Sequence, residues 1–159
     1  MVEQLIGPAL RALGMTNGKP GQLRMVLELS PKSIHHAKTI ATENACLWGV
    51  DDLAPDVGLV LAELLTNVLQ HARPAGNRET KVARYLVQRV PGGLVAVVHD
   101  DDPALPESRD ADEESIGGRG LQLVSAVANH VSITPSPPGK DITALFLSGG
   151  DPNQSGAAA

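Results

Sequence analysis

Aromatic side chains are almost missing from this chain of 159 residues, because Phe, Trp and Tyr together make up only 2% of it. Platforms on which bases could stack are therefore nearly absent, which argues against binding of single-stranded nucleic acid. The net charge of −5 also disfavours a partner with a phosphate backbone, so we expect no direct contact with nucleic acid. Leu, Val, Ile and Ala must instead build the core, for which the hydrophobic fraction of 42% is sufficient.

Cysteine and long apolar runs are equally scarce. Cys46 is the only cysteine, which excludes an internal disulfide and a thiolate metal cage. The N-terminus lacks the basic flank and long apolar core of a signal peptide, and no apolar run is long enough to span a bilayer. We therefore expect a cytoplasmic protein without membrane contact, and the length suits one domain.

Turn and cap residues divide the chain into elements of distinct periodicity. Ser30-Pro31 is a typical helix start, Gly49 is a typical helix end, and Pro91-Gly92-Gly93 is a hairpin signal. The predicted elements are, in chain order, a strand over 23–29, helices over 31–48 and 55–72, strands over 80–90 and 94–98, a helix over 119–129, and strands over 131–134 and 142–147.

Composition separates three parts of the chain. Residues 1–20 form an N-terminal extension, read as a weak helix or a tail with a flexible joint; residues 21–148 form the folded domain; and residues 149–159 form a disordered tail. Residues 101–118 are polar, acidic and rich in helix breakers, which predicts a long loop that acts as a lid. Because helices and antiparallel strands are partly segregated, the expected fold is a two-layer α/β sandwich.

A carboxylate, a carboxamide and an imidazole recur at four-residue steps on the second predicted helix. In LVLAELLTNVLQHA, residues 59–72, Glu63, Asn67 and His71 share one stripe, because each step drifts by only about 40° around the helix. The stripe borders the apolar face, where Glu63 could polarise a hydroxyl or a water molecule and Asn67 offers an oxygen to Mg²⁺. For this helix alone, a merely solvated stripe is the commoner explanation.

Three glycines in four residues precede the third predicted helix, in SIGGRGLQLV, residues 115–124. Such glycines let backbone amides approach an anion, the helix N-terminus adds partial positive charge, and Arg119 adds a fork of donors for phosphate. The segment matches neither the Walker loop nor the dinucleotide fingerprint. Loop glycines serve turns and helix caps about as often as ligands, so this cluster alone does not assign a site.

Three consecutive aspartates end an apolar run in VVHDDDPALP, residues 97–106. Repulsion between adjacent carboxylates raises the question whether the run holds a metal, holds another ligand or lies in water. A metal phosphotransferase or a calcium protein built on Asp100 and Asp102 is one alternative. The further oxygen ligands and the glycine of an EF-hand loop are missing, which counts against it.

Three segments together resemble the nucleotide-binding boxes of one superfamily. ELLTNVLQHA (63–72), HDDDPALP (99–106) and GGRGLQLV (117–124) are similar in order and spacing to the N, G1 and G2 boxes of GHKL ATPases, which include gyrase, Hsp90 and sensor histidine kinases. The similarity covers residues 22–148 and is greatest to the small anti-sigma-factor serine kinases of actinobacterial type. It implies a Bergerat fold, with a mixed, mostly antiparallel sheet of about five strands and three main helices on one face.

The resemblance also implies a role for each matching residue. Glu63 would be the general base that activates the substrate hydroxyl, and Asn67 would ligate the Mg²⁺ that bridges the ATP phosphates. Asp100 would accept a hydrogen bond from the adenine amino group. The remaining nucleotide-binding residues would be Gly118, Arg119 and Gly120, which hold the phosphates as the lid closes, and Leu121, which packs under that turn.

The activity implied by the resemblance is that of an ATP-dependent serine/threonine kinase in transcription regulation. Its substrate would be a STAS-type anti-sigma-factor antagonist, and the same protein would also bind a sigma factor and form a homodimer. A sensor histidine kinase is disfavoured, because no phosphoacceptor helix hairpin or membrane segment precedes the domain.

Several positions depart from the family pattern. Asp102 stands where the G1 box usually has Gly, or Ser in the actinobacterial relatives, and Asp101 is expected to face solvent without a role. An ungapped match puts Asp141 where the family often has an adenine-binding Thr, with Thr143 two residues further on, and this assignment stays open. Residues 100–114 hold eight acidic side chains and one basic one, so we expect weak affinity for anionic ATP.

A function without catalysis is therefore the second hypothesis. Asp102 and the acidic lid could have abolished turnover and left a binding module that regulates by protein contacts alone. The presence of Glu63, Asn67, Asp100 and the glycine segment argues against a complete loss of function.

Overall fold

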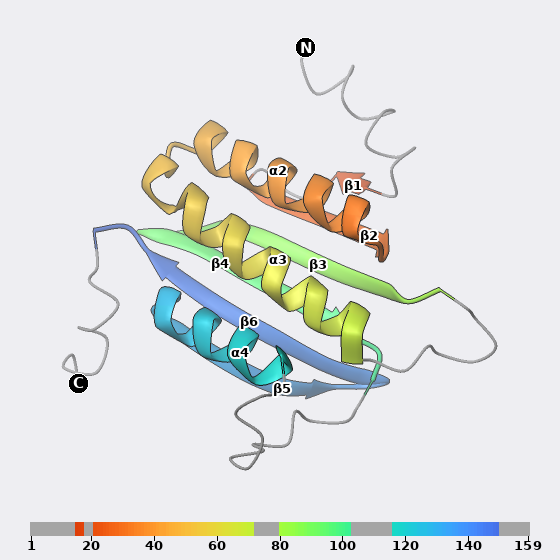
Figure 1. Ribbon diagram of the computed structural model, residues 1–159. Helices are drawn as coiled ribbons and strands as arrows, with labels where there is room; N and C mark the ends of the chain where they lie inside the picture. The colour runs from red at the N-terminus through yellow and green to blue at the C-terminus, as the bar shows by residue number, and fades with distance from the viewer. Residues whose placement is uncertain (1–14, 18–20, 72–79, 103–115, 150–159) are drawn as a thin grey trace.

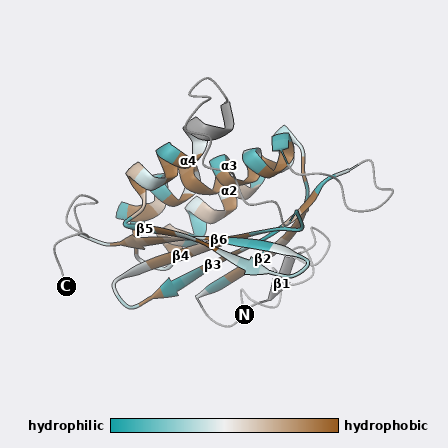
Figure 2. Ribbon diagram, turned by 90° about the horizontal axis from the view of Figure 1, so that it is seen from below, coloured by the Kyte–Doolittle hydropathy of each residue, from teal (hydrophilic) through white to brown (hydrophobic). Residues whose placement is uncertain are grey.

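The described part of the chain folds as a two-layer α/β sandwich, in which three helices cover one face of an antiparallel sheet (Figures 1 and 2). No helix of the described residues covers the other face, which is called the open face below. The computed structural model describes residues 15–17, 21–71, 80–102 and 116–149. The helices are α2 (Pro31–Leu47), α3 (Ala54–His71) and α4 (Ile116–Val127), and a short 3-10 helix η1 (Asp51–Leu53) precedes α3. The expected fold class is confirmed.

Six strands form the sheet in the order β1-β2-β3-β4-β6-β5, and every neighbouring pair is antiparallel. The strands are β1 (Met15–Asn17), β2 (Gln22–Glu28), β3 (Val82–Val90), β4 (Gly93–Asp100), β5 (His130–Ser136) and β6 (Gly139–Leu147). The unexpected strand is β1, which lies within the stretch read as a weak helix or tail. Three residues are too few to show an alternating pattern, and pairing with β2 makes them a strand. The predictions for residues 1–14 and for the tail beyond 149 lie outside the described residues.

The start of α2 follows directly from the sequence. The Ser30 side chain accepts a hydrogen bond from the Ser33 backbone N–H at 3.0 Å, and the Ser33 hydroxyl accepts one from the Ser30 N–H at 2.9 Å. Such a cap contributes about 1 kcal/mol to helix stability. After the helix, Gly49 has a φ of 77°, a left-handed conformation that glycine adopts without strain.

Helix α3 lies in the middle of the helical layer, between α2 and α4, and also contacts β4 (Figure 1). Gly58 lets α2 approach, because a Cβ there would lie 2.7 Å from the Thr42 hydroxyl. Figure 2 shows the apolar sides of the helices turned toward the sheet. The buried residues of α3 are Ala54, Val57, Gly58, Val60, Leu61, Leu64, Leu65 and Val68. This packing fixes the direction in which the polar residues of α3 point.

The third helix begins earlier than predicted. It starts at Ile116 instead of Arg119, so Gly117, Gly118 and Gly120 lie within its first turns and not in a turn ahead of it. Glycine is a poor helix former, and the local sequence therefore favoured a turn. The contact of α4 with α3 outweighs that preference. Most of the predicted lid, residues 103–115, lies outside the described residues.

The strands β4 and β6 are both longer than predicted, at the ends where they meet. β4 continues to Asp100 and β6 begins at Gly139, and Asp100 pairs with Lys140 across the two strands. His99 and Asp100 interrupt the apolar pattern, which is why the strand was predicted to end at Val98. The cross-strand pairing carries the strand two residues further.

Candidate functional site

Glu63 and Asn67 lie one turn apart on α3, and both side chains are half-buried. Among the described residues, neither side chain has a hydrogen-bond partner. His71 is the last residue of the helix and is exposed. A half-buried carboxylate and carboxamide without partners can bind a ligand without first breaking internal contacts. The two predicted residues are therefore placed together, whereas the imidazole lies at the solvated end of the same helix.

Gly120 of α4 packs directly against these two side chains. A Cβ at Gly120 would lie 3.2 Å from Glu63 Oε2, 3.2 Å from Asn67 Oδ1 and 3.3 Å from Asn67 Nδ2. Gly120 is buried, so α4 can lie this close to Glu63 and Asn67 only because the residue has no side chain. The structure thus brings the predicted carboxylate and carboxamide of one segment against a glycine that follows them by more than fifty residues.

The other predicted residues of the glycine segment are placed less completely. Leu121 is half-buried and packs against the hydrophobic core, as expected for a residue beneath the segment. Gly118 and Arg119 lie in the first turn of α4, and the position of the Arg119 side chain lies outside the described residues.

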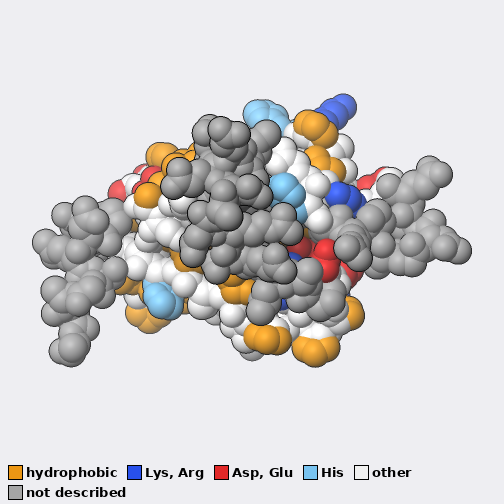
Figure 3. All heavy atoms as spheres, turned by 60° about the horizontal axis from the view of Figure 1, so that its bottom comes forward, with side chains coloured by type: hydrophobic (Ala, Val, Ile, Leu, Met, Phe, Trp, Pro, Cys, Tyr) orange, Lys and Arg blue, Asp and Glu red, His pale blue; other side chains and the backbone are white. Residues whose placement is uncertain are grey.

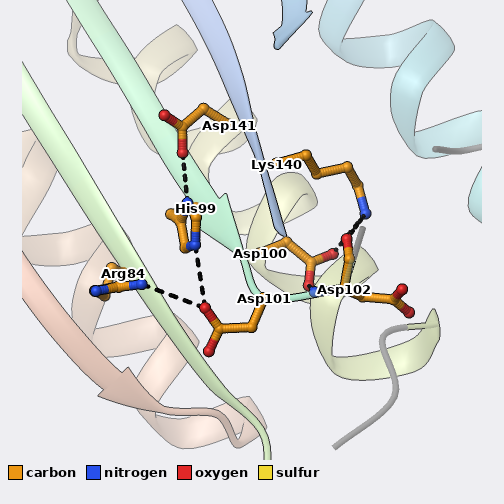
Figure 4. A network of polar contacts seen from close by, with 7 residues as sticks. All are labelled: Arg84, His99, Asp100, Asp101, Asp102, Lys140 and Asp141. Carbon is orange, nitrogen blue, oxygen red and sulfur yellow. Dashed lines mark hydrogen bonds and ion pairs between the residues drawn. The ribbon is translucent and has the colours of Figure 1, made fainter. Parts of the chain in front are cut away.

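Asp100 is buried at the end of β4 and makes two hydrogen bonds. Its Oδ1 accepts from the backbone N–H of Asp102 at 2.9 Å, and its Oδ2 accepts from the Lys140 ammonium at 3.1 Å. The same ammonium donates to the backbone carbonyl of Asp102 at 2.7 Å. Figure 4 shows Lys140 reaching from β6 to this corner. The contacts orient Asp100 and fix the first residues that follow β4.

The site residues gather at one end of the molecule. The C-terminal half of α3, the end of β4 and the start of α4 lie at the same end in Figure 1, and α3 contacts both other elements. In Figure 3, acidic side chains appear beside Lys or Arg side chains to the right of the centre of the view. The half-buried Glu63 and Asn67, the buried Gly120 and the buried Asp100 therefore lie at the same end of the fold.

Asp101 faces the open side of the sheet and is partly exposed, as expected, but its side chain has two partners. Its Oδ1 accepts from Arg84 at 3.3 Å and lies 3.1 Å from His99 Nε2, and its side chain is 35% exposed (Figure 4). Successive side chains alternate across a strand, so His99 and Asp101 face the open side while Asp100 faces the helices. Arg84 on the adjacent strand β3 and His99 two residues earlier on β4 thus give Asp101 a structural role.

The same alternation bears on whether Asp141 or Thr143 takes the place of the adenine-binding Thr of the family. Asp141 Oδ1 lies 2.6 Å from His99 Nδ1, on the open face of the sheet (Figure 4). Thr143 shares that face, because it follows Asp141 by two residues. His99 and Asp141 also border a cavity of about 480 Å³ on the open face. Neither Asp141 nor Thr143 therefore lies on the side of Asp100 and α3.

The comparison with known proteins agrees with this arrangement. The family model of the histidine kinase-like ATPase domain matches residues 27–146, well over half of the chain. The chain belongs to this family. No curated protein matches the chain. The matched range contains Glu63, Asn67, Asp100 and Gly120, the residues brought together at one end of the fold.

Membership of the histidine kinase-like ATPase family implies an ATP-binding domain with a kinase-like regulatory function. None of the helices that the structure describes is long and apolar enough to cross a membrane. The matched residues include all three helices and the strands from β3 onward, and they begin near the end of β2.

Magnesium is compatible with the residues of this ATPase domain. Among the described residues, no cluster of three or more His, Cys, Asp or Glu side chains could hold a metal by itself. Mg²⁺ beside a nucleotide needs only one or two protein oxygens, because phosphates and waters supply the others. The free carboxamide oxygen of Asn67 is a suitable donor, and Glu63 lies next to it. The Lys140 ammonium lies 3.1 Å from Asp100 Oδ2, and this cation counts against a calcium site on the aspartate run.

Lys140 is the residue that sequence reasoning missed. A single lysine after a Pro-Pro-Gly turn forms no distinctive motif. Its position in the strand is nevertheless informative. Every second residue of β6 points to the same face, and the four residues on that face are all buried: Lys140, Ile142, Ala144 and Phe146. A lysine in step with three core residues indicates a buried cation that needs an anionic partner.

Proposed function

We propose that the chain is an anti-sigma factor with serine/threonine kinase activity, which uses ATP to phosphorylate a STAS-type anti-sigma-factor antagonist. The contact of Gly120 with Glu63 and Asn67 carries the proposal, because it assembles the matched segments around an accessible carboxylate. A sigma factor is the second proposed partner, and the proposed protein acts in the cytoplasm as a homodimer. Serine specificity and the partners rest on the resemblance of the sequence segments.

Glu63 is proposed to accept the proton of the substrate hydroxyl. Its carboxylate is half-buried, lies beside the α4 segment and is free of hydrogen bonds within the described part of the chain. A general base needs such access to the proton that it receives. In phosphoryl transfer the protein mainly aligns the groups and stabilises charge, so the position of Glu63 matters more than its reactivity.

Asn67, Asp100 and the start of α4 are proposed to hold the nucleotide. Asn67 would hold Mg²⁺, which neutralises charge on the phosphates. Asp100 would accept from the adenine amino group, since each of its oxygens already has a fixed orientation. Gly118, Arg119 and Gly120 would contact the phosphates at the helix N-terminus, where backbone N–H groups favour an anion.

Binding and phosphotransfer test the proposal directly. Calorimetric titration with Mg-ATP measures binding, and transfer of the labelled γ-phosphate to purified STAS-domain proteins from the same organism measures activity. Glu63→Gln should lower the transfer rate by about 10²- to 10⁴-fold and change Mg-ATP affinity by less than about threefold. Gln122→Ala on the exposed side of α4 is the control and should transfer normally. Equal transfer rates in Glu63→Gln and the unsubstituted protein would remove the assigned role of Glu63.

A binding module without turnover is the second candidate function. The observation in its favour is that each oxygen of Asp100 already accepts a hydrogen bond, one from Lys140 and one from the Asp102 backbone, so an adenine amino group would share an oxygen with one of these donors. A thermal-shift measurement distinguishes the two, because a ligand that binds only the folded state raises the melting temperature. A clear rise with millimolar Mg-ATP supports nucleotide binding, and no rise supports the module.

A further inference from the structure

Asp100 and Lys140 are the two buried charged residues in the part of the chain that the structure describes. Their side chains are 9% and 7% exposed, and Lys140 Nζ lies 3.1 Å from Asp100 Oδ2. At such low exposure, loss of one partner leaves the other as an unpaired buried charge. The pair therefore has one strongly preferred arrangement, in which the ammonium fixes the direction of the carboxylate.

The backbone around the pair is equally constrained. A Cβ at Gly139 would lie 1.8 Å from the Asp100 carbonyl oxygen and 2.7 Å from the Asp101 carbonyl carbon. Asp100 and Lys140 are also directly opposite each other in the β4–β6 pair. The start of β6 thus supports the main chain of Asp100 through Gly139 and its side chain through Lys140.

These contacts leave the Asp100 carboxylate able to accept further hydrogen bonds. Among the described residues, Oδ1 has one donor, the Asp102 N–H, and Oδ2 has one donor, the Lys140 ammonium. An ionised carboxylate offers about four lone-pair sites, so acceptor capacity remains on both oxygens. It offers no hydrogen to donate. A ligand atom that approaches Asp100 on this side must therefore be a donor.

We infer that Lys140 is a positioning residue that holds Asp100 for a 6-amino group on a purine and sets the preference of the site for 6-amino over 6-oxo purine nucleotides. The inference rests on the proposed function, in which Asp100 accepts from adenine. A 6-amino group donates to the fixed carboxylate. A 6-oxo group is itself an acceptor, and it would leave buried lone pairs facing each other without a hydrogen.

ATP and ITP test this inference, because their purines differ at position 6, which carries an amino group in ATP and an oxo group in ITP. Calorimetric titration with each Mg-nucleotide gives the ratio of the two affinities. We expect the unsubstituted protein to prefer ATP by at least about tenfold, since buried polar groups discriminate strongly against a mismatched partner. Lys140→Met should lower ATP affinity by about tenfold and change ITP affinity by less than about threefold. Lys140→Arg, which keeps a cation with several donors, should restore most of the ratio.

A second comparison separates positioning from general stability. Asp100→Asn should lose the ATP preference, and adding Lys140→Met to it should lower ATP affinity no further, because Lys140 acts through Asp100. Lys38→Met, on the exposed side of α2, is the control for loss of a lysine and should behave as the unsubstituted protein. Melting curves identify variants that do not fold, and Lys140→Gln replaces Lys140→Met if the latter does not.

The outcomes distinguish this inference from the proposed function. An unsubstituted protein that does not bind Mg-ATP overturns the proposed function. An unsubstituted protein that prefers ATP, together with a folded Lys140 variant that keeps the same ratio, overturns only the positioning role. Additive losses in the double variant overturn it as well, because Lys140 would then act independently of Asp100.

Discussion

Gly120 of α4 lies so close to Glu63 of α3 that a methyl group on the glycine would come within 3.2 Å of the carboxylate. Two helices that are separated in sequence by two strands thereby meet at polar side chains. Helix propensity alone would disfavour a glycine at this position, and the close packing of α3 against α4 gives a reason for it.

Gly120→Ala should reduce nucleotide affinity without reducing stability. Alanine in place of a helical glycine stabilises a helix by up to about 1 kcal/mol, which offsets the tight contact of the new methyl group. The methyl group displaces Glu63 and Asn67, so we expect Mg-ATP affinity to fall by about tenfold. Calorimetry and urea unfolding measure the two effects. A large loss of stability, or unchanged affinity, would contradict the packing described for Gly120.

Asn67→Ala should remove the contribution of magnesium to ATP binding. The carboxamide oxygen is the proposed protein ligand, and its loss leaves the cation to phosphates and water. We expect ATP affinity in Mg²⁺ and in EDTA to become equal within about twofold, whereas the unsubstituted protein binds more tightly with Mg²⁺. His71→Ala, at the exposed end of the same helix, is the matched control and should keep the magnesium effect.

Asp102→Ser should increase Mg-ATP affinity at low ionic strength. One unit charge contributes about 1 kcal/mol at 4 Å in water, which corresponds to about a fivefold change in affinity. The difference between the two proteins should shrink at about 0.5 M NaCl, because salt screens a charge that is partly exposed to solvent. Sub-micromolar affinity of the unsubstituted protein for Mg-ATP would count against a repulsive role of the acidic residues.

Tyr85→Phe should make the domain more resistant to alkali. Burial raises the pKa of Tyr85 above its ordinary value, so the folded state keeps the phenol proton that the unfolded state loses. The free energy of unfolding of the unsubstituted protein is therefore unaffected by Tyr85 below about pH 10. Above that pH it decreases by up to about 1.4 kcal/mol per pH unit. Urea unfolding of both proteins between about pH 9 and pH 11.5 should show their stabilities diverging only above pH 10. Because Tyr85 is the only tyrosine, phenolate absorbance follows its titration directly.

The helices α2 and α3 could be predicted because local signals agree with their packing. Ser30-Pro31 predicts the cap that is present, and the apolar spacing of α3 matches its buried face. The start of α4 could not be predicted in the same way. Its glycines favour a turn locally, and only the contact with α3 makes them helical.

The site residues likewise differ in how far the sequence predicts their positions. Glu63 and Asn67 are one turn apart on a single helix, so their proximity follows from helical spacing. Lys140 reaches Asp100 through the register of two antiparallel strands, which sequence patterns leave undetermined. Arg84 and Asp101 meet for the same reason, across β3 and the end of β4.

Side chains at the end of β4 point alternately to the two faces of the sheet, so a displacement on one face can be transmitted to the other. Asp100 faces the helices, while its neighbours His99 and Asp101 are tied on the open face to Asp141 and Arg84. A molecule that pulled on Asp141 or Arg84 would thus displace a residue directly bonded along the chain to Asp100. Asp100, whose carboxylate is proposed to bind adenine, is thus joined by one peptide bond to residues of the open face. A nucleotide bound on the helical side would not contact that face.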